Sequence, residues 1–213
     1  MNRPIPTRRR RMSRPERERQ MLDIAEEVFA EQGYRAASMD EIAERVGVSK
    51  PMLYEYFGSK DGLLSACVAR IRTDLYEATQ EAMAGAGSPE DALWRGLLAY
   101  FAFMDRHNRA LAVIAQQPML IPAAAADAIE ATRRRQSGLT ASLLAAFAPD
   151  VPARAVEAYA EIIIGACERV SLWRARRPEV TAEEAARYVM DFSWQGLRAL
   201  APPLPHRGDE PPL

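Results

Sequence analysis

The residues best suited to chemistry lie between Ser49 and Lys60, in the stretch SKPMLYEYFGSK. Lysine and serine side chains bind phosphate oxygens, and tyrosine side chains can reach the sugars and base edges of a nucleic acid. Leu53 and Phe57 stand four residues apart, so one helix would bury both and turn the residues between them outward. This pattern favours contact with a polyanion such as DNA.

A second short helix is expected directly before this stretch, in residues 38–47. Ser38 can cap that helix while Glu41 reaches back to it, as in the S-x-x-E capping box. Gly47 marks a sharp turn, because glycine enters the left-handed backbone region without a Cβ clash. Small Ala43 lets the two helices cross closely. Together these signals predict a helix-turn-helix whose second helix meets DNA.

These residues also carry a resemblance to a known family. From Arg17 to about Val68 the chain resembles the N-terminal domain of TetR-family (tetracycline-repressor-like) transcriptional regulators, through MLDIAEEVFAEQGY (21–34), SMDEIAERVGVS (38–49) and KPMLYEYFGSKDGLL (50–64). The resemblance implies an all-helical homodimer with a variable C-terminal domain that senses a ligand. It also implies that the matching positions commonly touch DNA: Ser38, Ser49, Lys50, Pro51, Tyr54, Tyr56 and Lys60.

Two acidic residues depart from a purely basic DNA-binding surface. Asp40 and Glu55 place negative charge close to it. Either carboxylate can repel phosphate or accept a hydrogen bond from a cytosine amino group, so the operator sequence cannot be read from them. Tyr54 and Tyr56 also have an alternative interpretation as partly buried packing residues, and Lys60 has one as a solvated charge.

The N-terminal segment is strongly basic. Residues 3–19 hold eight arginines against Glu16 and Glu18, whereas residues 20–60 hold eight acids against four basic residues. We therefore expect a flexible arm, residues 1–16, to supply much of the attraction to phosphate and to be able to enter a minor groove. The alternative is a tail that only increases solubility.

Composition limits the other classes of protein. The 213 residues are 48% hydrophobic and 27% charged, and no apolar run approaches the roughly 20 residues that cross a bilayer. The Arg-rich N-terminus lacks the apolar core of a signal peptide, so a cytoplasmic location without membrane contact is expected. His107 and His206 stand apart, and no Gly-rich phosphate loop or serine elbow is present, which predicts no enzyme, no metal and no cofactor.

Cys67 and Cys167 form neither a disulfide framework nor a C-x-x-C motif. Each stands in an apolar, helical setting, which predicts two buried thiols. A redox-sensing pair is the alternative.

The rest of the chain predicts helices separated by caps and prolines, giving an all-α fold. Expected helices run from Lys60 to about Ala84, from Ser88 to about Arg106, from Asn108 to Gln117, from Pro122 to Phe147, between Pro152 and Arg177, and after Thr181. The predicted domains are a helix-turn-helix domain of three helices (17–62), a helical sensing and dimerisation domain (63–201) and a disordered tail (202–213). We expect a solvated helix face at Arg133, Arg134 and Arg135.

Two helices near the C-terminal end predict self-association. Between residues 152 and 177 two apolar stripes share one helix, so two partners are needed to cover it. Thr181 and Glu184 form a second S/T-x-x-E box that opens the next helix. We expect a four-helix dimer interface, and its predicted residues are Val156, Tyr159, Ile163, Ala166, Val170, Val189, Phe192 and Gly196. The alternative is that both stripes serve one monomeric core.

A sensing pocket is expected among the middle helices. Large or soft side chains and one acid can surround an apolar or amphipathic molecule, and the candidates are Trp94, Phe101, Met104, Met119, Glu168 and Trp173. The alternative for each of them is a place in the core without a ligand. Glu168 is costly to bury unpaired, and Arg169 and Arg174 are near enough in sequence to pair with it.

These interpretations converge on a DNA-binding regulator. The sequence predicts a homodimeric transcriptional repressor that leaves a palindromic double-stranded operator when a small molecule binds. The alternative is a regulator that acts constitutively or under control of a protein partner.

Overall fold

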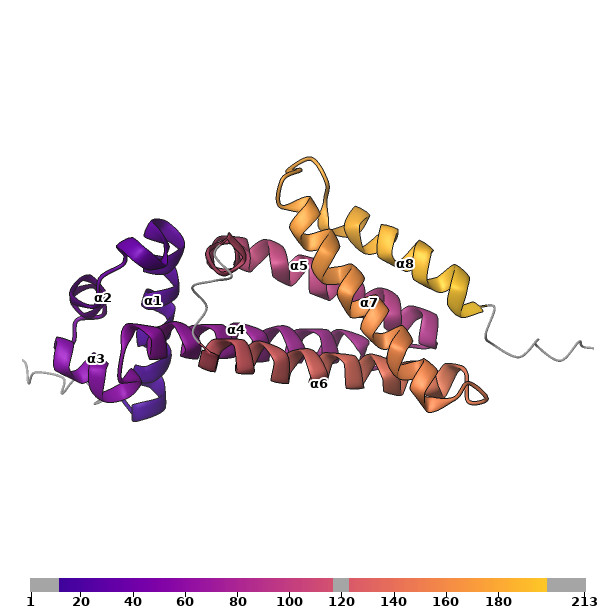
Figure 1. The fold of residues 1–213 in the computed structure, drawn as a ribbon, viewed down its shortest axis with the longest axis horizontal. Coiled ribbons are helices and arrows are strands. Elements are labelled where there is room, and N and C mark those ends of the chain that lie inside the picture. The colour runs from indigo at the N-terminus through magenta and orange to yellow at the C-terminus, as the bar shows by residue number, and fades with distance from the viewer. Residues whose placement is uncertain (1–11, 117–122, 199–213) are drawn as a thin grey trace, which may run out of the picture.

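The computed structural model describes residues 12–116 and 123–198. In these ranges the regular structure is entirely α-helical, which confirms the predicted fold class. A small N-terminal lobe contains α1 (Arg14–Ala36), α2 (Met39–Val46) and α3 (Lys50–Phe57). The long α4 (Lys60–Met83) leads from this lobe into a larger lobe (Figure 1).

The larger lobe contains the helices that follow α4 in the chain. They are α5 (Pro89–Gln116), α6 (Ala123–Phe147), α7 (Ala153–Arg174) and α8 (Ala182–Arg198). α4 packs against α5 and α6, and α7 and α8 cover them (Figure 1). None of the helices in the two described ranges is long and apolar enough to cross a membrane.

Local signals explain where most helices begin. The side chains of Ser59 and Ser88 accept from backbone N–H groups in the first turns of α4 and α5, as their sequence positions predict. The Thr181 box is complete, because Glu184 accepts from the Thr181 N–H at 2.8 Å and the Glu184 N–H donates to the Thr181 hydroxyl at 3.1 Å. The last turn of α4 ends before Gly85, which has a φ of 71°.

α1 begins inside the segment predicted as a basic arm. Ser13 and Glu16 form a full capping box that starts α1 at Arg14, so residues 14–16 are helical rather than part of an arm. Residues 1–11, which carry the other predicted arm arginines, lie outside the described residues, as do residues 199–213 with the predicted tail. Toward its other end α1 is interrupted at Gly33, where φ is 78°.

The helices predicted over 88–106 and 108–117 are one helix. α5 runs from Pro89 to Gln116 without a break in its assigned span. No glycine or proline occurs between Gly96 and Pro118, so nothing in the sequence forces the chain to leave the helix. His107 therefore lies within α5, where its Nδ1 is 3.0 Å from the Phe103 carbonyl oxygen.

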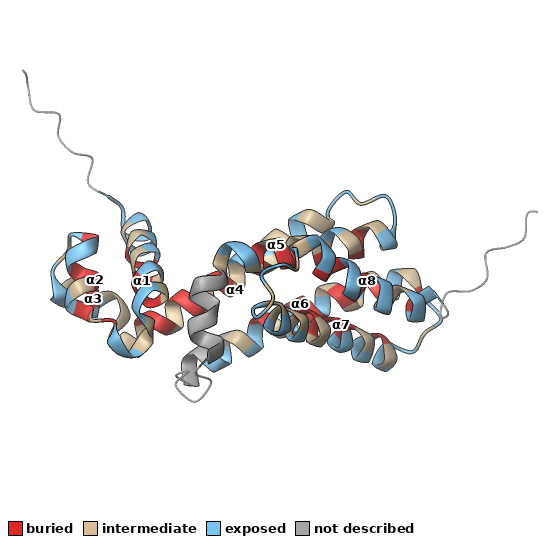
Figure 2. Cartoon of the chain, turned by 90° about the horizontal axis from the view of Figure 1, so that it is seen from above, coloured by how far each residue is buried: buried red, intermediate tan, exposed pale blue. Residues whose placement is uncertain are grey.

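The two lobes have separate hydrophobic cores that share α4. The first turns of α4 complete the N-terminal core through Leu63, Leu64, Cys67 and Val68. One turn further along, Ile71 and Leu75 belong to the core of the larger lobe. Buried residues mark this junction along α4 (Figure 2). α4 is therefore part of both cores.

Candidate DNA-binding surface, effector pocket and dimer face

The helix-turn-helix has the geometry that its sequence predicts. Gly47 is in the left-handed region (φ 78°, ψ 35°), and the N–H of Val48 donates to the Ala43 carbonyl at 3.0 Å. Leu53 is fully buried beneath α3 and Phe57 packs against the same core. These anchors leave Lys50 and Tyr54 exposed on the outer side of α3.

The two cap serines use their hydroxyl oxygens as acceptors, so their hydroxyl protons remain available. Ser38 Oγ accepts from the N–H groups of Asp40 and Glu41, and Ser49 Oγ accepts from the N–H of Met52. A hydroxyl that accepts in a cap can still donate its own proton, and the N-terminus of a helix attracts anions. Both predicted serines can therefore donate to phosphate without losing the cap.

Glu41 does not make the return contact that the capping box predicts. Its carboxylate pairs with Arg45 at 2.8 Å and accepts from Gln32 Nε2 at 2.6 Å. Arg45 also pairs with Glu31 at 2.8 Å, which ties α2 to α1. The acid thus joins two helices of the lobe instead of closing the Ser38 cap.

Pro51 is exposed, whereas Tyr56 and Lys60 are partly covered by their own lobe. Tyr56 is half-buried, with the Arg14 guanidinium 5.2 Å from its ring centre. Lys60 Nζ lies 4.6 Å from the Tyr34 ring centre and donates to the Arg35 carbonyl at 3.3 Å. Burial lowers the pKa of Lys60.

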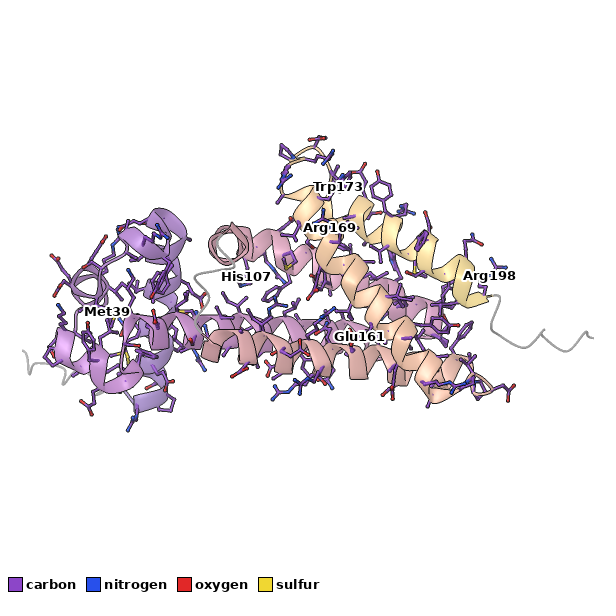
Figure 3. All side chains as sticks on the ribbon, viewed as in Figure 1. Met39, His107, Glu161, Arg169, Trp173 and Arg198 are labelled. Atoms are coloured by element: carbon purple, nitrogen blue, oxygen red, sulfur yellow. The ribbon has the colours of Figure 1, made fainter. Side chains whose placement is uncertain are left out.

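The predicted pocket residues do not surround one cavity. Phe101 is fully buried in the core, while Trp94 is half-buried with the Arg187 guanidinium 5.4 Å from its ring centre. Met104 borders a separate surface hollow beside Asp105 and Arg174. Trp173 is 38% exposed and lies near the end of α7, by the turn to α8 (Figure 3). Met119 lies outside the described residues.

A small, partly open cavity of the larger lobe has a different lining. Its volume is about 30 Å³, room for one water molecule. It lies where α4, α5, α6 and α7 meet, and its lining includes Thr79, Leu97, Tyr100, Gln136, Ile163 and Cys167. Gln136 Nε2 donates to Thr79 Oγ1 at 2.8 Å, whereas the buried Gln136 Oε1 has no hydrogen-bond partner among the described residues. In the sequence, a glutamine that follows three arginines suggests a solvent-exposed position, so Gln136 was not predicted as a lining residue.

Glu168 has different partners from those expected. It faces Arg72 of α4 and Arg133 of α6 rather than arginines of its own helix. Arg174 pairs instead with Asp105 of α5. Arg133 is half-buried and also faces Glu161, so only Arg134 and Arg135 of the basic run fit the predicted solvated face.

Both cysteines are buried, as predicted. Cys67 belongs to the N-terminal core and Cys167 to the core of the larger lobe. Burial raises the pKa of Cys67, and it raises the pKa of Cys167 to about 12. Two protonated thiols in separate cores do not form the redox-sensing pair that the sequence left open.

The predicted dimer residues divide into core and surface. Val156, Ile163 and Val189 are buried within the chain's own core, which corrects the expectation that they face a second copy. Tyr159, Ala166 and Val170 are partly buried against that core. Phe192, by contrast, is 79% exposed and Gly196 is exposed too.

Large apolar side chains nevertheless remain exposed on α7 and α8. Ile162 is 57% exposed and Tyr188 is 51% exposed, in addition to Phe192. A groove of about 310 Å³ runs between the two helices. Its lining residues are Tyr159, Ile162, Ile163, Phe192, Ser193, Gly196 and Leu197. The periodicity of apolar residues predicted both helices correctly. It was wrong in placing Val156, Ile163 and Val189 on the dimer face, because these residues are buried in the core.

Comparison with known proteins agrees with this geometry. Residues 21–67 match the family profile described as bacterial regulatory proteins of the tetR family, and residues 89–196 match the tetracyclin repressor-like C-terminal domain. The chain is 30% identical over 198 residues to the HTH-type transcriptional activator FasR of Mycolicibacterium smegmatis, covering 88% of this chain and 85% of FasR.

Solved structures show the same architecture. A TetR-like transcriptional regulator from Rhodococcus sp. RHA1 has a TM-score of 0.68 and 35% identity, covering 88% of this chain and 99% of that one. PfmR, a TetR family transcriptional regulator from Thermus thermophilus, shares the fold with a TM-score of 0.64 and 24% identity, covering 82% and 97% of the two chains. The chain therefore belongs to the TetR family of helix-turn-helix transcriptional regulators.

Proposed function

We propose that this regulator binds a palindromic operator as a homodimer and is released from it by a small apolar or amphipathic molecule. The observation that carries the proposal is the double role of α4. Because its first turns complete the DNA-binding lobe and its later turns line the cavity, a ligand that moves α4 also moves α3. Only a ligand that prefers the displaced state can shift the balance.

Further contacts support this coupling between the lobes. Ile129 of α6 packs against the N-terminal core, and α5 contacts α1. Arg70 of α4 pairs with Asp23 and Glu26 of α1, each at 2.7 Å. The lobes are therefore joined on several sides, so a rearrangement of the middle helices reaches the DNA-binding surface directly.

Support for the homodimer comes from the exposed apolar face of α7 and α8. Two recognition helices related by a two-fold axis read two half-sites, which one chain alone cannot do. The residues placed on the DNA side are Ser38, Ser49, Lys50, Pro51, Tyr54, Tyr56 and Lys60. We place the effector in the cavity of the larger lobe rather than around the six residues expected from the sequence.

The experiment that tests this proposal first identifies the operator in the absence of any ligand. Selection from a random duplex library is expected to yield a palindrome with half-site centres about one helical turn apart or slightly more. Candidate metabolites are then added to the complex and release is followed by fluorescence anisotropy. Selection of a single unpaired half-site would overturn the dimeric reading.

One observation favours the alternative, a regulator without a small ligand. The cavity holds only about 30 Å³, so any larger molecule must separate the helices. If no compound changes operator affinity while the palindrome binds tightly, the constitutive or protein-controlled reading holds. A reporter gene behind the selected operator distinguishes a repressor, which we propose, from an activator, the word used for FasR.

A further inference from the structure

Three charged side chains from three helices meet beside the cavity. Arg72 of α4 and Arg133 of α6 both face the carboxylate of Glu168 on α7. Arg72 Nη1 lies 3.9 Å from Glu168 Oε1, and Arg133 Nε lies 3.7 Å from Glu168 Oε2. Both distances exceed a hydrogen bond. Glu168 thus offsets the charge of the two arginines without satisfying their donors.

Each of the two arginines has a buried N–H donor that lacks an acceptor among the described residues. The Nε atoms of Arg72 and Arg133 are buried, and neither has a hydrogen-bond partner among the described residues. A buried N–H without an acceptor is costly, and a guanidinium group is shaped to hold carboxylate or phosphate oxygens. The far side of Arg133 faces Glu161, whose Oε2 is 3.5 Å from Nη2 and whose other oxygen accepts from Ser137 at 2.6 Å. The unused Nε of Arg133 therefore lies on the side of Glu168.

This charged cluster lies near the cavity. Cys167, directly before Glu168, lines the cavity, and Gln136, three residues after Arg133, lines it too. Tyr100 is another lining residue, and the charges of Arg72 and Glu168 act on its hydroxyl. A molecule with an apolar chain in the cavity would bring its head group to the arginines.

We propose that Arg72 and Arg133 form the head-group site of the effector and that this effector is an anionic amphiphile with a carboxylate or phosphate head. The proposal rests on the proposed ligand-controlled function. Without ligand, Glu168 stands in for the anion and holds α4, α6 and α7 together. A bound anion displaces that carboxylate, which releases α7 from the two arginines and lets the helices part to admit the chain.

Three molecules with the same alkyl chain test the site: decanoate, decyl phosphate and 1-decanol. Isothermal titration of the full-length protein, below the micellar range, is expected to show both anions binding at least roughly tenfold tighter than the alcohol, because each gains charge-assisted hydrogen bonds. Arg72→Met and Arg133→Met should lose this preference. Arg134→Met is the matched control, since Arg134 is exposed on the same helix and pairs with Glu130.

Glu168→Gln provides the converse test. The amide removes the competing carboxylate with little change in shape, so decanoate should bind roughly tenfold tighter than to the unaltered protein. Thermal melting of each variant shows that it remains folded. Equal affinity for all three molecules, an Arg134→Met variant as impaired as Arg133→Met, or a folded Glu168→Gln variant that binds none of them would overturn the anion site.

Operator binding, measured in parallel, tests the head-group site and ligand-controlled release of DNA separately. If 1-decanol releases the DNA as well as decanoate does, the anion site is wrong and ligand-controlled release stands. If the anions bind with the expected preference but leave operator affinity unchanged, the head-group site stands and ligand-controlled release is wrong.

Discussion

Lys50 Nζ lies 2.8 Å from the Asp40 carboxylate, which links the first turn of α3 to the first turn of α2. The hydrogen bond and the negative charge of Asp40 raise the pKa of Lys50. Asp40 is therefore the partner of a predicted phosphate-binding lysine, and it offsets that charge on the surface proposed to meet DNA.

Replacing Asp40 by asparagine should strengthen DNA binding. The change frees Lys50 and removes one negative charge, so affinity for specific and random duplexes should rise several-fold at low salt, and the gain should shrink between about 50 and 200 mM salt. Fluorescence anisotropy over that range measures it. Glu90→Gln makes the same charge change at the exposed start of α5 and should have no effect. Weaker binding by Asp40→Asn would instead mean that this carboxylate contacts a base.

Lys60 and Tyr54 should affect different components of binding. Lys60→Ala should weaken all DNA binding and flatten the salt dependence by about one unit, because one phosphate contact is lost. Tyr54→Ala should reduce affinity for the selected operator more than for random DNA, since Tyr54 is exposed on the proposed recognition face. Competition titrations on both DNA types separate these effects. Equal losses on both DNA types for both variants would show that the recognition face is misassigned.

Local signals predict much of this fold. Ser59, Ser88 and Thr181 mark helix starts where the structure has them, and Gly47 marks the turn between α2 and α3. These features depend on a few neighbouring residues. The start of α1 carried the same kind of signal in Ser13 and Glu16, which was hidden within a run of arginines.

The sites of the larger lobe were harder to predict because they depend on packing between distant helices. Periodicity shows that α7 has two apolar stripes, but not that Ile163 lies inside while Ile162 lies outside. Likewise, no sequence pattern pairs Arg72 with Glu168 or places Gln136 in a cavity. Contacts of this kind follow from the crossing of helices, which local sequence does not specify.

Gly62 should be intolerant of any side chain. A Cβ at this position in the first turn of α4 would lie 2.0 Å from the Phe57 carbonyl oxygen. Gly62→Ala should therefore push α3 away from α4, lower the free energy of unfolding by about 1–3 kcal/mol and weaken operator binding.

Gly138→Ala is the matched control for this change. Gly138 lies within α6, and a Cβ added there would meet no other atom within 4 Å. Alanine should therefore stabilise α6 by up to about 1 kcal/mol. Urea denaturation compares the two variants. Equal stability changes would refute the steric account of Gly62.

Glu26 should make stability depend on pH. Burial raises its pKa to about 7, although the charge of Arg70 opposes the shift. The folded chain therefore holds a proton that the unfolded chain releases at its ordinary value, 4.5. The resulting stabilisation is complete below about pH 4.5 and is lost as the pH rises through about 7.

The variant Glu26→Gln isolates this effect. The unfolding free energy of the unaltered protein relative to Glu26→Gln should fall by about 1–3 kcal/mol between about pH 5 and pH 8. Denaturant titrations at both pH values measure it, and Glu27→Gln, at an exposed neighbour, is the control. A relative stability that rises with pH would mean that the ion pair with Arg70 outweighs burial.

Phe192 offers the sharpest test of the dimer. Its side chain is 79% exposed, so glutamate there costs the isolated chain little, but a charge buried between two copies would separate them. Phe192→Glu should sediment as a folded monomer and lose about a hundredfold or more in affinity for the palindrome, because the two half-sites no longer bind together. Ala146→Glu, an exposed position on α6, should stay dimeric. If Phe192→Glu remains a dimer with normal operator binding, the interface lies elsewhere, and the proposal that α7 and α8 hold the recognition helices one DNA turn apart fails with it.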